Sequence, residues 1–82
     1  MKILVVEDER LISLVLSRMI QGLGHSILAC VPSAAGAIEA LEGGKADLVL
    51  MDIRLEGDLD GIEAARILKE RWAIPLVFTS AY

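Results

Sequence analysis

Short runs of aliphatic residues alternate along the chain with longer stretches in which hydrophobic residues recur every three or four positions. The runs cover residues 3–6, 27–31, 48–51 and 76–78. Short runs that are continuously apolar are typical of strands buried on both faces, and the stretches between them favour amphipathic helices. The pattern therefore predicts four strands that alternate with three helices.

Each predicted helix has a hydrophobic stripe and a stop signal. The first is predicted over residues 9–21 and ends at Gly22 and Gly24. The second begins after Ser33 as N-cap and ends at Gly43–Gly44, and the third ends before Ile74-Pro75. The three stripes are Ile12, Val15, Leu16, Met19, Ile20 and Leu23; Ala34, Ala37, Ile38 and Leu41; and Ile62, Ala65, Leu68 and Trp72.

Strands separated by helices join through right-handed crossovers into a parallel sheet, so the predicted fold class is α/β with a doubly wound parallel sheet. In such sheets ligands bind beyond the carboxyl ends of the strands. The chemistry of this chain should therefore lie where the predicted strands end.

Composition narrows the class of protein. The 82 residues are enough for one domain, and no apolar run reaches the roughly 18 residues that a membrane span needs. No secretory signal pattern follows Met1, and the single Cys30 cannot form an internal disulfide, so we expect a cytoplasmic protein in which Cys30 is a small buried hydrophobe. A net charge of −4 without a basic cluster argues against direct binding to nucleic acid.

Acidic residues follow two of the predicted strands. Glu7-Asp8-Glu9 ends the first and Asp52 ends the third. Each acid alone could simply favour the start of the following helix. If the first and third strands are neighbours, however, about 4.8 Å apart, Glu7, Asp8 and Asp52 converge on one pocket. An all-oxygen cluster of this kind suits Mg²⁺, whereas His25 and Cys30 are too few and too distant to indicate zinc.

A carboxylate beside a metal ion is a suitable nucleophile for phosphoryl transfer, and Asp52 fits that role best. A hydroxyl at the end of the fourth strand, on Ser80 or Thr79, could hydrogen-bond a phosphoryl oxygen. Capping of the strand end is the alternative role for these hydroxyls.

Four segments, ILVVEDE, LVLMDIRL, DGIEAA and PLVFTSAY, resemble the receiver domains of two-component response regulators, in the family's order. The resemblance implies a CheY-like, flavodoxin-like sheet with strand order 2-1-3-4-5. It makes Asp52 the phosphoacceptor, Asp8 a direct Mg²⁺ ligand and Glu7 a ligand through water. Arg54 would supply a main-chain carbonyl to the metal, and Ser80 would be the switch hydroxyl, with Thr79 one position early.

The resemblance also implies partners and activity. The donor would be a histidine kinase or a phosphotransfer protein, and the domain would promote only its own phosphorylation and dephosphorylation. Receivers usually carry a proline four residues after the phosphoacceptor, where this chain has Glu56 and a longer approach to Asp60-Gly61. That variant resembles a receiver subgroup and does not indicate loss of function.

Residues 1–82 match a receiver that lacks its last helices and its fifth strand, with the phosphate-pairing lysine that the strand carries. We therefore expect a homodimer through the edge of the fourth strand, and water against Ile3, Val5 and the Met19–Ile20 stripe. Two other functions stay open: an interaction module that no longer takes phosphate, and a phosphatase of the haloacid-dehalogenase type. The second requires an aspartate two residues after the nucleophile, where this chain has Arg54.

Overall fold

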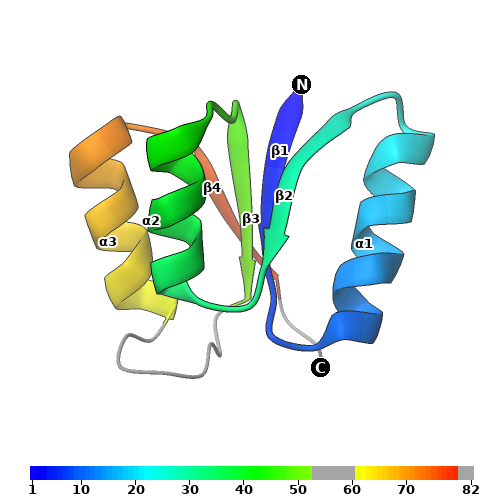
Figure 1. The fold of residues 1–82 in the computed structure, drawn as a ribbon, viewed down its shortest axis with the longest axis horizontal. Helices are drawn as coiled ribbons and strands as arrows, with labels where there is room; N and C mark the ends of the chain where they lie inside the picture. The colour runs from blue at the N-terminus through cyan, green and yellow to red at the C-terminus, as the bar shows by residue number, and fades with distance from the viewer. Residues whose placement is uncertain (53–60, 80–82) are drawn as a thin grey trace.

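The computed structural model describes residues 1–52 and 61–79, which form a single four-stranded parallel sheet with helices on both faces (Figure 1). The strands are β1 (Lys2–Val6), β2 (Ser26–Val31), β3 (Leu48–Asp52) and β4 (Leu76–Thr79). The helices are α1 (Arg10–Gly22), α2 (Ala34–Gly43) and α3 (Gly61–Trp72). Strand order is β2-β1-β3-β4, which confirms the predicted doubly wound α/β class and places β1 and β3 side by side.

The two faces of the sheet have separate cores. Figure 1 shows α1 alone on one face and α2 with α3 on the other. Alternate residues of a strand point to opposite faces, so Leu4 and Val6 of β1 pack toward α2 and α3, while Ile3 and Val5 pack with Ile20 of α1. Burial on both faces explains why the predicted strands are continuously apolar.

The predicted helix ends are confirmed to within one residue. The Gly36 backbone N–H donates to the Ser33 hydroxyl oxygen at 3.1 Å, so Ser33 caps α2. Gly24 has a φ of +90°, a conformation that glycine adopts without strain, and its N–H donates to the Gln21 carbonyl at 3.0 Å. These two positions define the turns that bring α2 and β2 back onto the sheet.

Several predicted core positions are wrong. Met19, Val15 and Leu23 are 60%, 50% and 75% exposed, because α1 is the only helix on its face among the described residues and only its central stripe meets the sheet. Ile62 is 63% exposed, since α3 turns Ala64, Ala65 and Leu68 inward instead.

Two further sequence predictions about burial are also wrong. Ile3, Val5 and the Met19–Ile20 stripe were expected to meet water. Met19 is exposed as expected, but Ile3, Val5 and Ile20 are buried, because they pack together between the sheet and α1. Cys30 was expected to be buried but is exposed, since it lies on β2, the strand at one edge of the sheet.

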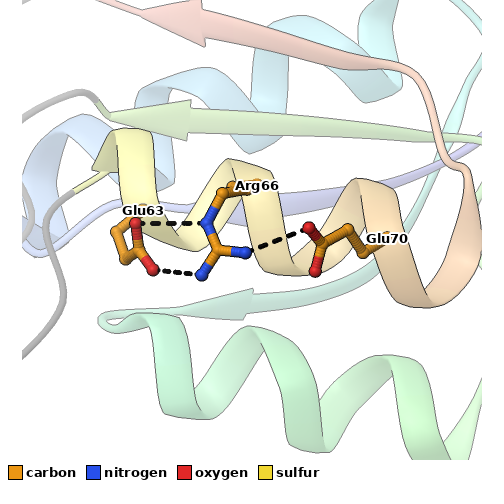
Figure 2. A network of polar contacts seen from close by, with 3 residues as sticks. All are labelled: Glu63, Arg66 and Glu70. Atoms are coloured by element: carbon orange, nitrogen blue, oxygen red, sulfur yellow. Dashed lines mark hydrogen bonds and ion pairs between the residues drawn. The ribbon is translucent and has the colours of Figure 1, made fainter.

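The outer surface of α3 carries an ion-pair network. Figure 2 shows the Arg66 guanidinium between two carboxylates, donating to Glu63 and, at 3.0 Å, to Glu70. The hydrogen bond from Arg66 lowers the pKa of Glu63, and Glu63 in turn raises the pKa of Arg66. All three side chains are exposed, so the network organises the helix surface and contributes little to stability.

None of the helices in the described part of the chain is long and apolar enough to cross a bilayer.

Candidate functional site: an acid cluster at the carboxyl ends of β1 and β3

The acid cluster predicted from the sequence is present. β1 pairs in parallel with β3, so the residues after β1 meet the last residue of β3 at one edge of the sheet. Carboxylate oxygens of Glu7, Asp8 and Asp52 all lie within 4.8 Å of one another. The predicted convergence of these three residues is therefore confirmed.

The acid cluster is largely buried, and backbone hydrogen bonds fix the position of Glu7. Glu7 and Asp52 are 5% and 7% exposed, and Asp8 is half-buried. The Glu7 N–H donates to the Val31 carbonyl at 2.9 Å, and the Glu9 N–H donates to Glu7 Oε1 at 3.4 Å. Helix α1 uses Glu9 as its N-cap, without a side-chain capping bond. Capping of α1 therefore does not explain why Asp8 lies at this position.

Proximity of the acids perturbs the protonation of the cluster. Burial raises the pKa of Glu7 to about 7, and a side-chain hydrogen bond to Asp52 and the negative charges of Asp52 and Asp8 act in the same direction. A proton on Glu7 relieves the repulsion in the absence of a cation. A divalent cation would relieve it in the same way while leaving the carboxylates ionised.

The chemistry of the donors suits a hard cation. All three candidate ligands are carboxylates, and Mg²⁺ prefers a few carboxylate oxygens with the remaining positions free for water or phosphate. Nitrogen and sulfur ligands are absent from this group. His25 Nδ1 lies 3.0 Å from the amino terminus of Met1, and Cys30 Sγ lies 2.9 Å from Ser17 Oγ.

The other predicted site residues are placed only in part. Thr79, the last residue of β4, is the register partner of Asp52 and is half-buried. Arg54 and Ser80 lie outside the described residues. Their predicted roles, a metal-binding carbonyl and a switch hydroxyl, stay predictions.

One feature beside the cluster was missed by the sequence predictions. A groove of about 910 Å³ is lined by residues of α1 and β2 together with Glu7 and Asp8. Ser13, a buried serine in the otherwise apolar stripe of α1, lines it. A polar residue at a core position of a helix is the sequence signal that could have indicated this groove.

Comparison with known proteins agrees with the fold. Residues 3–82 match the family model of the response regulator receiver domain. The chain is 33% identical over 82 residues to the phyllosphere-induced regulator PhyR of Methylorubrum extorquens, covering 99% of this chain and 31% of that protein.

Two solved structures illustrate the structural likeness. The receiver domain of Erythrobacter litoralis PhyR is 36% identical with a TM-score of 0.90, covering 99% of this chain and 63% of that one. The regulator TrrA of Thermotoga maritima, solved with Mg²⁺ and BeF, is 29% identical with a TM-score of 0.90, covering 99% of this chain and 70% of that one.

The chain belongs to the response regulator receiver domain family, and its general role is in two-component signalling. It spans about a third of the length of the curated relatives it matches.

Proposed function

We propose that this chain is a phosphoacceptor in a two-component phosphorelay and takes a phosphoryl group on Asp52. Asp8 and Asp52 would bind Mg²⁺ directly, Glu7 through water, and the Arg54 main-chain carbonyl would complete the protein ligands. The observation that carries the proposal is the convergence of three carboxylates within 4.8 Å at the edge of the sheet. TrrA of Thermotoga maritima, a structural neighbour, was solved with Mg²⁺ and BeF, which supports the choice of cation.

The proposed reaction is a displacement at phosphorus. A carboxylate oxygen of Asp52 forms a bond to phosphorus while the bond from phosphorus to the donor atom breaks, and the leaving group keeps the bonding electron pair. Mg²⁺, when bound, neutralises charge on the phosphoryl oxygens. Ser80 is the proposed partner for one of these oxygens, and Thr79, which pairs in register with Asp52, is the second candidate.

The chain would act in the cytoplasm, and its proposed donor is a histidine kinase, a phosphotransfer protein or a small acyl phosphate. The domain would catalyse no reaction beyond gaining and losing its own phosphoryl group. Two of the curated relatives, PhyR and PdtaR, are regulators, which supports a signalling role of this kind.

Incubation with acetyl phosphate and Mg²⁺, followed by intact-mass measurement, tests the proposal. We expect the mass of one phosphoryl group to be added, the product to be cleaved by hydroxylamine, and Asp52→Asn to abolish the addition. Asp47→Asn is the matched control, because Asp47 accepts a hydrogen bond from the Lys2 N–H, away from the acid cluster. A folded chain that gains no phosphoryl group would favour the interaction module instead.

Magnesium binding is tested separately by thermal melts. Relief of carboxylate repulsion should raise the midpoint, and Mg²⁺ at about ten times its Kd would add about 1.4 kcal/mol to the free energy of unfolding. Asp8→Asn should remove most of this gain. If millimolar Mg²⁺ does not change the thermal midpoint of the native chain, the proposed metal site is wrong.

We also propose that the chain forms a homodimer through β4. This strand forms one edge of the described sheet, and its Val77 and Phe78 are 49% and 41% exposed. An apolar edge with unpaired backbone groups can pair with a second copy across a two-fold axis. Sedimentation equilibrium should show a dimer that Val77→Lys dissociates, whereas Leu23→Lys on exposed α1 should not. A monomer at micromolar concentration contradicts this proposal.

A further inference from the structure

The groove between α1 and β2, next to the acid cluster, combines a reactive group with open space. Ser13 and Ser17 of α1 form one wall and Cys30 of β2 forms part of the other. Arg10 and Asp8, which carry opposite charges, also line the groove. The groove therefore offers a thiol, hydroxyl groups and both signs of charge within one space of about 910 Å³.

The thiol of Cys30 is exposed and held toward α1. Its Sγ lies 2.9 Å from Ser17 Oγ, and Ser17 Oγ donates to the Ser13 carbonyl at 2.8 Å. A hydroxyl has only one hydrogen to donate, and Ser17 donates it to the Ser13 carbonyl. The Cys30 thiol is therefore the donor in its contact with Ser17 Oγ. Cys30 is the only cysteine of the chain, and it has no internal disulfide partner.

A second observation points to a ligand. Ser13 is 9% exposed, and its hydroxyl makes no hydrogen bond among the described residues, although its N–H and its carbonyl both do. Among the described residues, every fully enclosed side-chain nitrogen or oxygen has a hydrogen-bond partner. The unpartnered Ser13 hydroxyl is therefore not fully enclosed, and Ser13 lines the groove. Because this hydroxyl is accessible from the groove, a ligand bound there can donate a hydrogen bond to it or accept one from it.

The strand register gives the distance that a group attached to Cys30 must span to reach the acid cluster. Cys30 pairs in register with Val5, two residues before Glu7. With a rise of about 3.3 Å per residue and about 4.8 Å between strands, the cluster begins roughly 8 Å from Cys30. An adduct the size of one amino acid on Cys30 spans that distance.

We propose that this groove is a thiol-modification site, in which Cys30 forms a mixed disulfide with a small thiol that carries both an ammonium and a carboxylate group. The carboxylate of the adduct faces Arg10, the ammonium faces Asp8, and the Ser13 hydroxyl bonds one of its polar atoms. This inference goes beyond phosphoryl transfer, because it assigns a second chemistry to the domain.

The reaction is thiol–disulfide exchange with a low-molecular-weight disulfide as oxidant. The Cys30 thiolate attacks one sulfur, a new S–S bond forms to Cys30, and the S–S bond of the oxidant breaks. The departing half leaves as a thiolate and takes up the proton that Cys30 lost. Cys30 is oxidised and one half of the oxidant is reduced, so the electrons balance.

Rates of modification by three disulfides test the site. Cystine is zwitterionic, bis(2-hydroxyethyl) disulfide is neutral and dithiodipropionate is anionic. Each rate on the folded chain, followed by intact mass, is divided by the rate on the urea-unfolded chain, which cancels the intrinsic reactivity of the reagent. We expect cystine to be favoured over the neutral disulfide by about threefold for each ion pair that forms.

Variants of the lining residues test which side chains cause the preference for cystine. Arg10→Gln and Ser13→Ala should each reduce the preference for cystine, whereas Arg18→Gln, an exposed arginine of α1 that does not line the groove, should leave it unchanged. Equal normalised rates for all three disulfides in the native chain would overturn the proposal. A preference that survives both Arg10→Gln and Ser13→Ala would overturn it as well.

The adduct should also weaken Mg²⁺ binding, because it places bulk and an ammonium at the mouth of the acid cluster; this part rests on the proposed function. Thermal melts of the cystine-modified and reduced chains measure it. If the reduced chain ignores Mg²⁺, the proposed metal site fails and the rate comparison alone decides the thiol site. If both forms respond equally to Mg²⁺, the adduct does not lie beside the cluster and the proposed thiol site is wrong.

Discussion

Replacing Glu7 by glutamine should remove most of the pH dependence of stability in the absence of magnesium. Glu7 is 5% exposed, and its burial next to Asp52 raises its pKa to about 7. Glutamine keeps the size of the side chain and offers an amide N–H to Asp52 without carrying a charge. Glu7→Gln therefore tests the electrostatics of the cluster with little change in packing.

The direction of the pH dependence follows from the linkage between proton binding and folding. The folded chain binds a proton at Glu7 more tightly than the unfolded chain, whose carboxyl has the ordinary pKa of 4.5. The favourable contribution of Glu7 to folding is thus fully present below about pH 4.5 and is lost as pH rises to about 7. Above pH 7 the free energy of unfolding loses nothing further through this group.

The magnitude follows from the same two values. A difference between 4.5 and about 7, at about 1.4 kcal/mol per pH unit, gives about 3 kcal/mol. Entry of water or movement of Asp52 when Glu7 ionises would reduce the loss, so about 3 kcal/mol is the upper limit. At pH 8 Glu7→Gln should stabilise the fold by up to this amount.

Urea denaturation at several values between pH 4.5 and 8, in EDTA, measures the effect. Glu39→Gln on the exposed surface of α2 is the control and should leave the pH profile of the native chain unchanged. Saturating Mg²⁺ should flatten the profile, because the cation competes with the proton for the cluster. If Glu7→Gln and the native chain lose stability in parallel as pH rises, the pH dependence does not arise at Glu7 and the reasoning is refuted.

Three further changes test the packing and the helices. Leu68→Ala should lower the free energy of unfolding by about 3 kcal/mol in urea denaturation, because it leaves a cavity between α3 and the sheet. Ile62→Ala, at an exposed site, should change it by no more than about 0.5 kcal/mol, and equal losses would contradict the observed burial. Ser33→Ala should lose about 1 kcal/mol with the α2 cap, and Ser33→Asp should restore it. Arg66→Ala should leave the thermal midpoint unchanged in about 1 M salt, where exposed charges are screened, and a clear drop there would assign the network a larger role.

Much of the candidate site could be predicted because one geometric rule connects sequence and space. Glu7, Asp8 and Asp52 each follow an apolar run, and parallel strands deliver such residues to one edge of the sheet. What hydrophobic periodicity does not specify is that β1 and β3 are neighbours. That order came from the resemblance to receivers, and the structure confirms it for the four described strands.

Burial on the helices was predicted less well. A period of three to four residues identifies the direction of the buried face, but its width depends on how many neighbours the helix has. Helix α1 meets only the sheet, so Ile20 is buried while Met19 beside it is 60% exposed. On α3 the small residues Ala64 and Ala65 let the helix approach α2 and the sheet, and the larger Ile62 faces outward.

Cys30 and Ser13 also show that burial cannot be predicted from the local sequence pattern alone. A cysteine in an apolar run and a serine in an apolar stripe both suggest tolerated core positions, and Ser13 is indeed buried. Cys30 is exposed because β2 is an edge strand, and strand order is not encoded in the run itself. Together these positions leave a groove where local patterning predicts continuous packing. A polar residue that interrupts a buried stripe next to an edge strand therefore indicates a space that the chain does not fill by itself.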